Sequence, residues 1–252
     1  MLLAAAQFKA VASGFSKNLE IHKKLVEAAA TKSVRLVLFP ELSLTGYELN
    51  LPKDLKFQCN DARLDSLQSL AIRHDIHLLV GVPCHSDGGI GIGQVLLRPN
   101  GQRELFLKKH LHSEERPFFV CGNRQESCQV TVGNARLGLA ICFEITKDTH
   151  IAQALSPDVC CLVACVAKTP AGIGRAHQRL SEIAKRYERP VIVSNFAHSD
   201  SIIESGGGSS AFDSKGKQLC EMDESVEGLL LFDIEHQQSE LLELTPEPGE
   251  TP

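Results

Sequence analysis

The sequence has no excess of basic residues and no long apolar run. Lys and Arg number 26 against 31 Asp and Glu, so the formal net charge is −5. This balance excludes attraction to a phosphate backbone as the main source of affinity, and we expect no nucleic-acid partner. The longest uncharged apolar run, Val159 to Ala167, has nine residues. That is less than half of the roughly 20 residues that a membrane-spanning helix needs, so we expect no membrane partner.

Motifs for metals and phosphates are also missing. The nine cysteines include no Cys-x-x-Cys pair that histidines could complete into a zinc site. The glycine-rich segment 88–93 lacks the Lys-Ser/Thr and the following helix of a phosphate loop, and we interpret it as a flexible lead-in to a hairpin. The sequence therefore predicts neither a metal nor a cofactor.

The first residues resemble a strand more than an export signal. Met1 to Ala6 is apolar but has no basic residues before it, and the run stops at Gln7 and Lys9. Nine cysteines, an odd number, then favour reduced thiols. We expect a cytoplasmic location.

Hydrophobic periodicity predicts alternating strands and helices. The length, 252 residues, is about 1.7 times the roughly 150 residues typical of one domain. The alternation of strands and helices favours one α/β domain over residues 1–252. The tail from about residue 245 is rich in proline and is predicted to be loose. Helices are expected at 17–32, 64–74, 149–154 and 173–187. Strands are expected at 2–8, 34–39, 76–82, 91–98, 102–109, 127–132, 135–141, 159–167 and 190–196, with further short strands between 208 and 234.

Cys142 is the first candidate for chemistry. It ends an apolar strand in the segment ICFE and precedes a helix-like segment. A cysteine at such a turn is lifted out of the sheet, and backbone N–H groups point at the same space, which favours a thiolate and forms an oxyanion site. The alternative is a buried, inert cysteine, which is the commoner case for any one cysteine.

A carboxylate and an ammonium complete the candidate group. Glu41 directly follows the strand that ends in VLFP, where apolar surroundings raise the pKa of a carboxylate toward the range of a general base. Lys108 and Lys109 end another strand, in FLKKHL, where a lysine could stabilise a developing oxyanion. The alternatives are a solvated loop glutamate and lysines that guard a sheet edge.

The order of FPELSLTGYE, LKKHL and ICFE resembles the nitrilase, or carbon–nitrogen hydrolase, superfamily. The resemblance covers nearly the whole chain and implies a four-layer α-β-β-α sandwich. It assigns Glu41 as general base, Lys108 as the oxyanion-stabilising lysine and Cys142 as nucleophile. The family pattern aromatic-x-Lys-x-His-Leu favours Lys108 over Lys109. Glu115, followed by an aromatic residue and a glycine at the family's spacing, is expected as a supporting carboxylate.

The implied reaction is hydrolysis of a small amide through a thioester on Cys142, with release of ammonia or an amine. The backbone N–H of Phe143 is expected to help Lys108 hold the oxyanion. Hydrolysis of a nitrile or an N-carbamoyl amine by the same triad is the alternative, and a nitrilase-like binding or assembly module is the non-enzymatic one. The resemblance also implies a homodimer or a higher homo-oligomer.

Two observations limit the resemblance. After the nucleophile many members carry an Asp, then Arg, an aromatic residue, Pro and Glu, whereas this chain continues with Glu144 and then ITKDT. The missing Arg and Pro-Glu weaken any transfer of substrate preference. A cysteine–histidine protease is a further alternative, but no papain-type signature surrounds Cys142.

Overall fold

The protein is built on two β-sheets, as seen in a computed structural model that describes residues 1–50, 55–198 and 204–244. One sheet has seven strands and the other has six. Within the described residues, no helix combines the length and the apolarity that crossing a membrane requires. The tail predicted to be loose from about residue 245 lies outside the described residues.

The seven-stranded sheet is formed by the beginning and the end of the chain. Its order is β13-β12-β1-β2-β3-β4-β5, with β1 to β3 parallel and the remaining neighbours antiparallel. The strands are β1 (Leu2–Gln7), β2 (Leu36–Leu38), β3 (His77–Ser86), β4 (Gly89–Leu97), β5 (Arg103–Leu107), β12 (Gly228–Asp233) and β13 (Gln238–Glu243).

The six-stranded sheet is formed by the middle of the chain. Its order is β11-β10-β9-β8-β7-β6, with β7, β8 and β9 parallel. The strands are β6 (Gln129–Val132), β7 (Ala135–Ile141), β8 (Cys161–Cys165), β9 (Val191–Ser194), β10 (Ser210–Phe212) and β11 (Gln218–Glu221).

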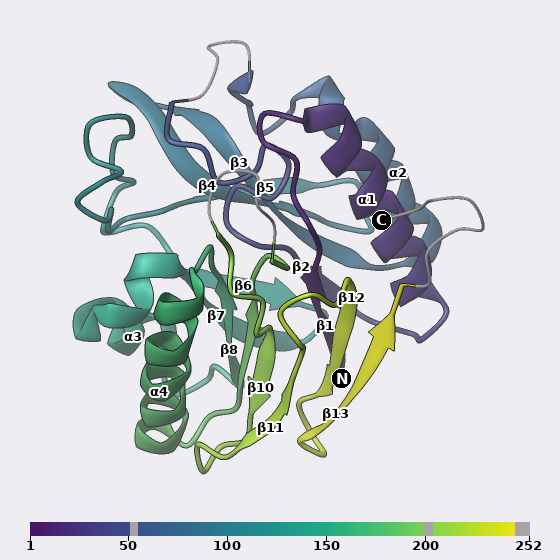
Figure 1. The fold of residues 1–252 in the computed structure, drawn as a ribbon, viewed down its shortest axis with the longest axis vertical. Helices are drawn as coiled ribbons and strands as arrows, with labels where there is room; N and C mark the ends of the chain where they lie inside the picture. Colours follow the sequence, from purple (N-terminus) through teal and green to yellow (C-terminus); the bar gives the residue numbers. More distant parts are fainter. Residues whose placement is uncertain (51–54, 199–203, 245–252) are drawn as a thin grey trace.

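Helices lie in two pairs on opposite sides of the sheets (Figure 1). One pair is α1 (Phe15–Ala30) and α2 (Asp65–His74), and the other is α3 (Asp148–Ala154) and α4 (Pro170–Tyr187). Two short 3₁₀ helices are η2 (Ala62–Leu64) and η3 (Cys142–Thr146). The helix α4 starts where it does because Thr169 caps it by accepting a hydrogen bond from the Gly172 N–H, and Pro170 suits the first helical position.

Three apolar cores separate four layers. Strand β1 alternates between two of them: Ala4 and Ala6 face the core shared with α1 and α2, whereas Leu3 and Ala5 face the core between the sheets. The third core lies between the six-stranded sheet and the helices α3 and α4. This α-β-β-α arrangement confirms the predicted fold class.

The positions of the predicted helices and strands are confirmed to within a few residues, with two differences. Strand β13 was not expected, because its sequence QSELLE is too polar to show a strand pattern. The interpretation of segment 88–93 as a flexible lead-in is wrong, because β4 already begins at Gly89. A Cβ on Gly91 would lie 2.7 Å from the Leu107 side chain, so glycine here serves close packing between strands.

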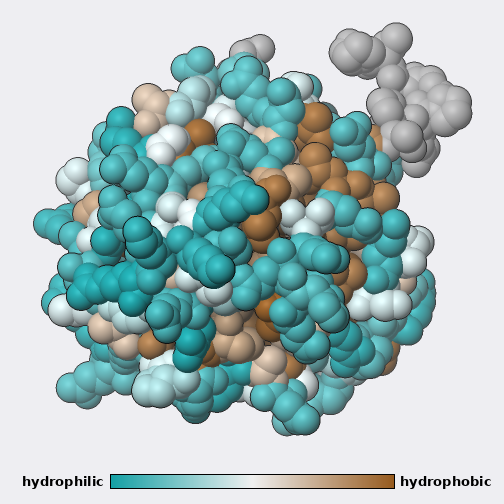
Figure 2. Space-filling view, turned by 90° about the horizontal axis from the view of Figure 1, so that it is seen from below, coloured by the Kyte–Doolittle hydropathy of each residue, from teal (hydrophilic) through white to brown (hydrophobic). Residues whose placement is uncertain are grey.

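The surface is mainly polar. On the face shown in Figure 2, hydrophilic residues dominate, and apolar residues form a band along one side. The large apolar side chains that are exposed in the described part of the chain are Ile72, Phe118 and Leu241.

Candidate functional site

Glu41 is held in a tight turn after β2. Its side chain is fully buried, and the next residue, Leu42, has a φ of 54°, in the left-handed region. Gly81 of β3 lies directly beneath this turn, where an added Cβ would approach the Pro40 carbonyl oxygen to 2.4 Å and the Leu42 nitrogen to 2.5 Å. The turn can therefore settle on the sheet only because residue 81 has no side chain.

Lys108 leaves the end of β5 on the same edge of the sheet. The strands β2, β3 and β5 run in the same direction, so their carboxyl ends lie together. The Lys108 side chain is fully buried, and its Nζ lies 2.6 Å from Glu41 Oε1. A buried ammonium is tolerated only when it is paired and hydrogen-bonded, as it is here.

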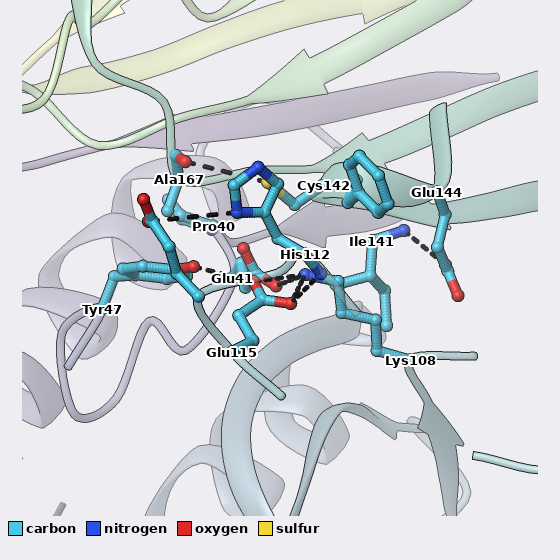
Figure 3. Close-up of polar contacts among 12 residues, drawn as sticks. Pro40, Glu41, Tyr47, Lys108, His112, Glu115, Ile141, Cys142, Glu144 and Ala167 are labelled. Atoms are coloured by element: carbon cyan, nitrogen blue, oxygen red, sulfur yellow. Dashed lines mark hydrogen bonds and ion pairs between the residues drawn. The ribbon is translucent and has the colours of Figure 1, made fainter. Parts of the chain in front are cut away.

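Glu115 completes the pairing of this ammonium (Figure 3). Its two oxygens accept hydrogen bonds from Lys108 Nζ at 2.7 and 2.8 Å. They also accept from the His112 N–H at 2.8 Å and from the Tyr47 hydroxyl at 2.7 Å. The carboxylate is thus fixed from three sides, and it orients the ammonium.

Cys142 lies at the turn between β7 and η3. Its φ is 47°, a left-handed conformation that a non-glycine residue adopts at a cost of about 1–3 kcal/mol, typically at functional sites. The thiol lies 3.7 Å from the Ala167 carbonyl oxygen and is only 4% exposed. Asn195 holds the segment beyond Ala167, because its side chain accepts from the Lys168 N–H and donates to the Lys168 carbonyl.

The structure brings these residues together from both sheets. Figure 3 shows Glu41, Lys108 and Cys142 gathered at one place, with Glu115 beside them. The Glu41 Oε2 atom is buried and has no hydrogen-bond partner among the residues that the structure describes. One carboxylate oxygen is thus engaged with the ammonium, and the other is available to accept a proton.

The pKa shifts in the group favour Glu41 as a proton acceptor but oppose loss of the thiol proton from Cys142. Burial raises the pKa of Glu41 above its usual value, and the Lys108 charge only partly opposes this. Burial and the neighbouring Glu41 raise the pKa of Cys142 to about 11, so the free protein holds a thiol. Burial acts to lower the pKa of Lys108, but Glu41, Cys142 and Glu115 raise it, and the ammonium stays charged.

Glu115 titrates differently from Glu41. Burial acts to raise the pKa of Glu115, but the Lys108 charge and the hydrogen bonds described above lower it overall. Two carboxylates beside one ammonium thus separate into a permanent anion and a stronger base, a division typical of acid–base sites.

Phe143 contributes an aromatic ring next to Cys142. The ring is half-buried and meets the His112 ring edge-on, with centroids 5.2 Å apart. Lys147 Nζ lies 4.2 Å from the ring centroid, a cation–π contact. The backbone N–H that we expect to donate to the oxyanion belongs to the first turn of η3.

Lys109 and Glu114, the sequence neighbours of Lys108 and Glu115, lie elsewhere. The ammonium of Lys109 donates to the Glu126 carbonyl. Glu114 is exposed, 3.9 Å from His112. The family spacing and the geometry therefore select the same residues.

Glu144 is a buried residue to which the sequence reasoning assigned no role. It is buried, and its two oxygens accept hydrogen bonds from the Lys109 N–H at 2.6 Å and from the Ile141 N–H at 2.8 Å. It therefore links the segment that follows Lys108 to the segment that precedes Cys142. The available signal was an acidic residue inside the apolar run around ICFEI. Tyr47, in FPELSLTGYE, was likewise given no role.

No metal centre is evident in the part of the chain that the structure describes, where no group of three or more His, Cys, Asp or Glu is arranged to hold an ion. The polar atoms at the site fit a proton-transfer group instead, because an ammonium occupies the space between the two carboxylates.

Comparisons with known proteins point to one family. A family model described as carbon-nitrogen hydrolase matches residues 2–242. Among curated proteins no match is found.

Similar solved structures include several forms of an amidase from Nesterenkonia sp. AN1. The NitN amidase is 22% identical over 92% of each chain, with a TM-score of 0.81. A cysteine-to-alanine mutant in complex with butyramide is 21% identical over 92% of this chain and 89% of that chain, also with a TM-score of 0.81. A mutant with acrylamide added at the active-site cysteine has a TM-score of 0.82, at 22% identity over 92% of each chain. At this level of identity the likeness establishes the fold.

Proposed function

This chain belongs to the carbon-nitrogen hydrolase family, an enzyme family, and from that premise we propose that it hydrolyses a small, non-peptide amide through a thioester on Cys142. The observation that carries the proposal is the buried Glu41–Lys108–Glu115 group beside the Cys142 thiol, with Lys108 Nζ 2.6 Å from Glu41. The butyramide and acrylamide bound by structurally similar amidases support an amide substrate.

In the first half of the proposed reaction, Glu41 takes the thiol proton and the Cys142 sulfur attacks the carbonyl carbon. Lys108 and the Phe143 N–H hold the tetrahedral oxyanion, each such donor being worth roughly 10²–10³ in rate in other hydrolases. Protonated Glu41 returns its proton to the leaving nitrogen. The C–N bond breaks, ammonia or an amine departs, and a thioester remains on Cys142.

In the second half, water replaces the sulfur. Glu41 removes a proton from the water, whose oxygen attacks the thioester carbon. The resulting intermediate is held by the same donors, and it collapses to a carboxylic acid and the thiol. The raised pKa of Glu41 suits both halves, because the carboxylate must accept a proton and return it in each cycle.

The proposal is tested with a panel of small amides, nitriles and N-carbamoyl amines, each scored for ammonia. We expect release from amides, and we expect Cys142→Ala to abolish it while the fold is retained. Hydroxylamine added during turnover should convert the thioester to a hydroxamate. Release from nitriles or N-carbamoyl amines alone would change the substrate class, and no release from any compound would favour a binding or assembly module.

We further propose a homo-oligomer in a reducing, cytoplasmic setting. All nine cysteines are free, which supports a reducing compartment. The apolar band in Figure 2 offers surface for contact with a second copy. The outer side of α4 carries the exposed charges of Arg175, Glu182 and Lys185 and is the less suitable surface. Light scattering coupled to size exclusion measures the state, and a monomer that turns over substrate would contradict this proposal.

A further inference from the structure

A cavity lies beside the turn that carries Cys142. Its volume is about 560 Å³, within the roughly 300–1,000 Å³ of small-molecule sites. Two segments line it: residues 110–124, which follow Lys108, and residues 143–147, which follow Cys142. The lining includes Phe143, whose backbone N–H we assign to the oxyanion, but none of the side chains of Glu41, Lys108, Glu115 and Cys142.

The cavity carries an unbalanced positive charge. Arg116, Arg124 and Lys147 line it together with His110, and no acidic residue does. Within the described residues, neither arginine forms an ion pair. Three cations gathered without a counter-charge are unexpected in a chain whose net charge is −5, because they repel one another unless an anion joins them.

The floor of the cavity is apolar. Leu111 and Phe119 are 3% and 4% exposed, and the half-buried Phe143 ring forms a further side. Burial, followed by the nearby Arg124, lowers the pKa of His110 to about 4. His110 is therefore neutral at pH 7, and its ring offers a hydrogen-bonding group beside the three cations.

We propose that this cavity binds a small organic anion, with its carboxylate or phosphate group held by Arg116, Arg124 and Lys147 and its carbon skeleton against Leu111, Phe119 and Phe143. Guanidinium groups bind oxyanions through two parallel hydrogen bonds, and Lys147 adds a point charge. The modest volume, about 560 Å³, and the net negative charge of the chain argue against an extended polyanion such as a nucleic acid. Because Phe143 and Lys147 follow Cys142, the occupant would touch the nucleophile turn.

Calorimetry at constant ionic strength tests the proposal directly, without any assay of turnover. The probes are succinate, inorganic phosphate and the neutral, non-amide 1,4-butanediol, added to the full chain carrying Cys142→Ala so that no probe is consumed. We expect at least one anion to bind, and 1,4-butanediol to bind at least tenfold more weakly than that anion. Tighter binding of succinate would identify a carboxylate ligand, and tighter binding of phosphate would identify a phosphate ester. No binding of either anion would overturn the proposal.

Matched variants distinguish anion binding in this cavity from a general effect of positive surface charge. Arg116→Gln with Arg124→Gln should weaken anion binding at least tenfold. Arg73→Gln, which removes a 65% exposed arginine on α2, should leave it unchanged. Equal weakening by both changes would refute a specific cavity.

The exposed thiol of Cys121 gives an independent readout, because it also lines the cavity. Saturating anion should slow its alkylation by iodoacetamide at least fivefold, as followed by peptide mass. Alkylation of Cys121 at an unchanged rate would show that the anion binds elsewhere and would contradict the assignment.

Discussion

The Glu144 carboxylate accepts a hydrogen bond from the backbone N–H of Lys109 at 2.6 Å and so connects two segments 35 residues apart. Its other oxygen accepts from the Ile141 N–H. The peptide groups that it holds adjoin Lys108 on one side and Cys142 on the other. The relative position of the ammonium and the thiol therefore depends on a residue that need not touch a substrate.

Glu144→Gln should lower kcat at least tenfold, with a smaller change in KM. The amide retains one acceptor but turns an N–H₂ group toward a backbone donor, and one charged hydrogen bond is worth about 1.5–3 kcal/mol. Circular dichroism checks that the fold is kept. Glu144→Asp keeps both acceptors at a shorter reach and should recover part of the lost kcat, a rescue that a purely structural role would not require.

The same residue should make stability depend on pH. Burial raises the pKa of folded Glu144 to about 7, against 4.5 as the ordinary value. Its contribution to stability is therefore full below pH 4.5, falls as the pH rises to about 7 and is constant above that. Urea unfolding should show the wild-type protein losing about 3 kcal/mol relative to Glu144→Gln over this range. A constant difference from pH 4.5 to 8 would contradict the raised pKa.

Glu115→Gln should reduce kcat/KM at least tenfold, because it leaves the buried Lys108 ammonium with one anionic partner instead of two. The matched control is Glu114→Gln at the neighbouring position, whose side chain is 74% exposed. That change should leave kcat/KM within twofold. Equal losses in both variants would exclude a specific role for Glu115.

Alkylation of Cys142 should depend strongly on pH and on Glu41. With a pKa of about 11, the thiolate fraction, and hence the rate with iodoacetamide, should rise about tenfold per unit between pH 7 and 10. Glu41→Gln removes the charge that raises this pKa, so alkylation should become at least threefold faster while turnover is lost. Peptide mass spectrometry distinguishes Cys142 from the other thiols. Slower alkylation in this variant would indicate that Glu41 assists the thiol even without substrate.

Gly81→Ala should disturb the Glu41 turn. The new Cβ meets backbone atoms of Pro40, Leu42 and Ser43 at 2.4–2.7 Å, and overpacking of this kind costs about 1–3 kcal/mol. Both Tm and kcat should fall. Gly174→Ala is the control, because an added Cβ meets nothing within 4 Å on α4, and it should stabilise the protein by about 1 kcal/mol.

Periodicity and turn chemistry were sufficient to predict most helices and strands, because the helices bury one face in a core and inner strands such as β1 bury both faces. They did not reveal β13, whose side chains are mostly exposed and whose place is set by pairing with β12. A strand at the edge of a sheet is defined by its backbone partner, which a local pattern does not contain.

The sequence could likewise indicate some residues of the candidate site but not others. Glu41, Lys108, Glu115 and Cys142 follow strand ends or a family spacing, so the sequence could indicate them. Tyr47 and Glu144 act through hydrogen bonds that span 68 and 35 residues of chain, and such contacts arise only when the loops are folded. The cationic cavity likewise combines two segments that no local pattern connects.

The reacting group draws on both sheets, and this has a consequence for how the protein is made. Glu41 and Lys108 leave the sheet that β12 and β13 complete, whereas Cys142 leaves the other. A chain emerging from the ribosome carries these three side chains before β12 and β13 have been synthesised. We therefore expect the three side chains to reach their final arrangement only after the β12–β13 hairpin has paired with β1, so that the thiol becomes reactive late in folding.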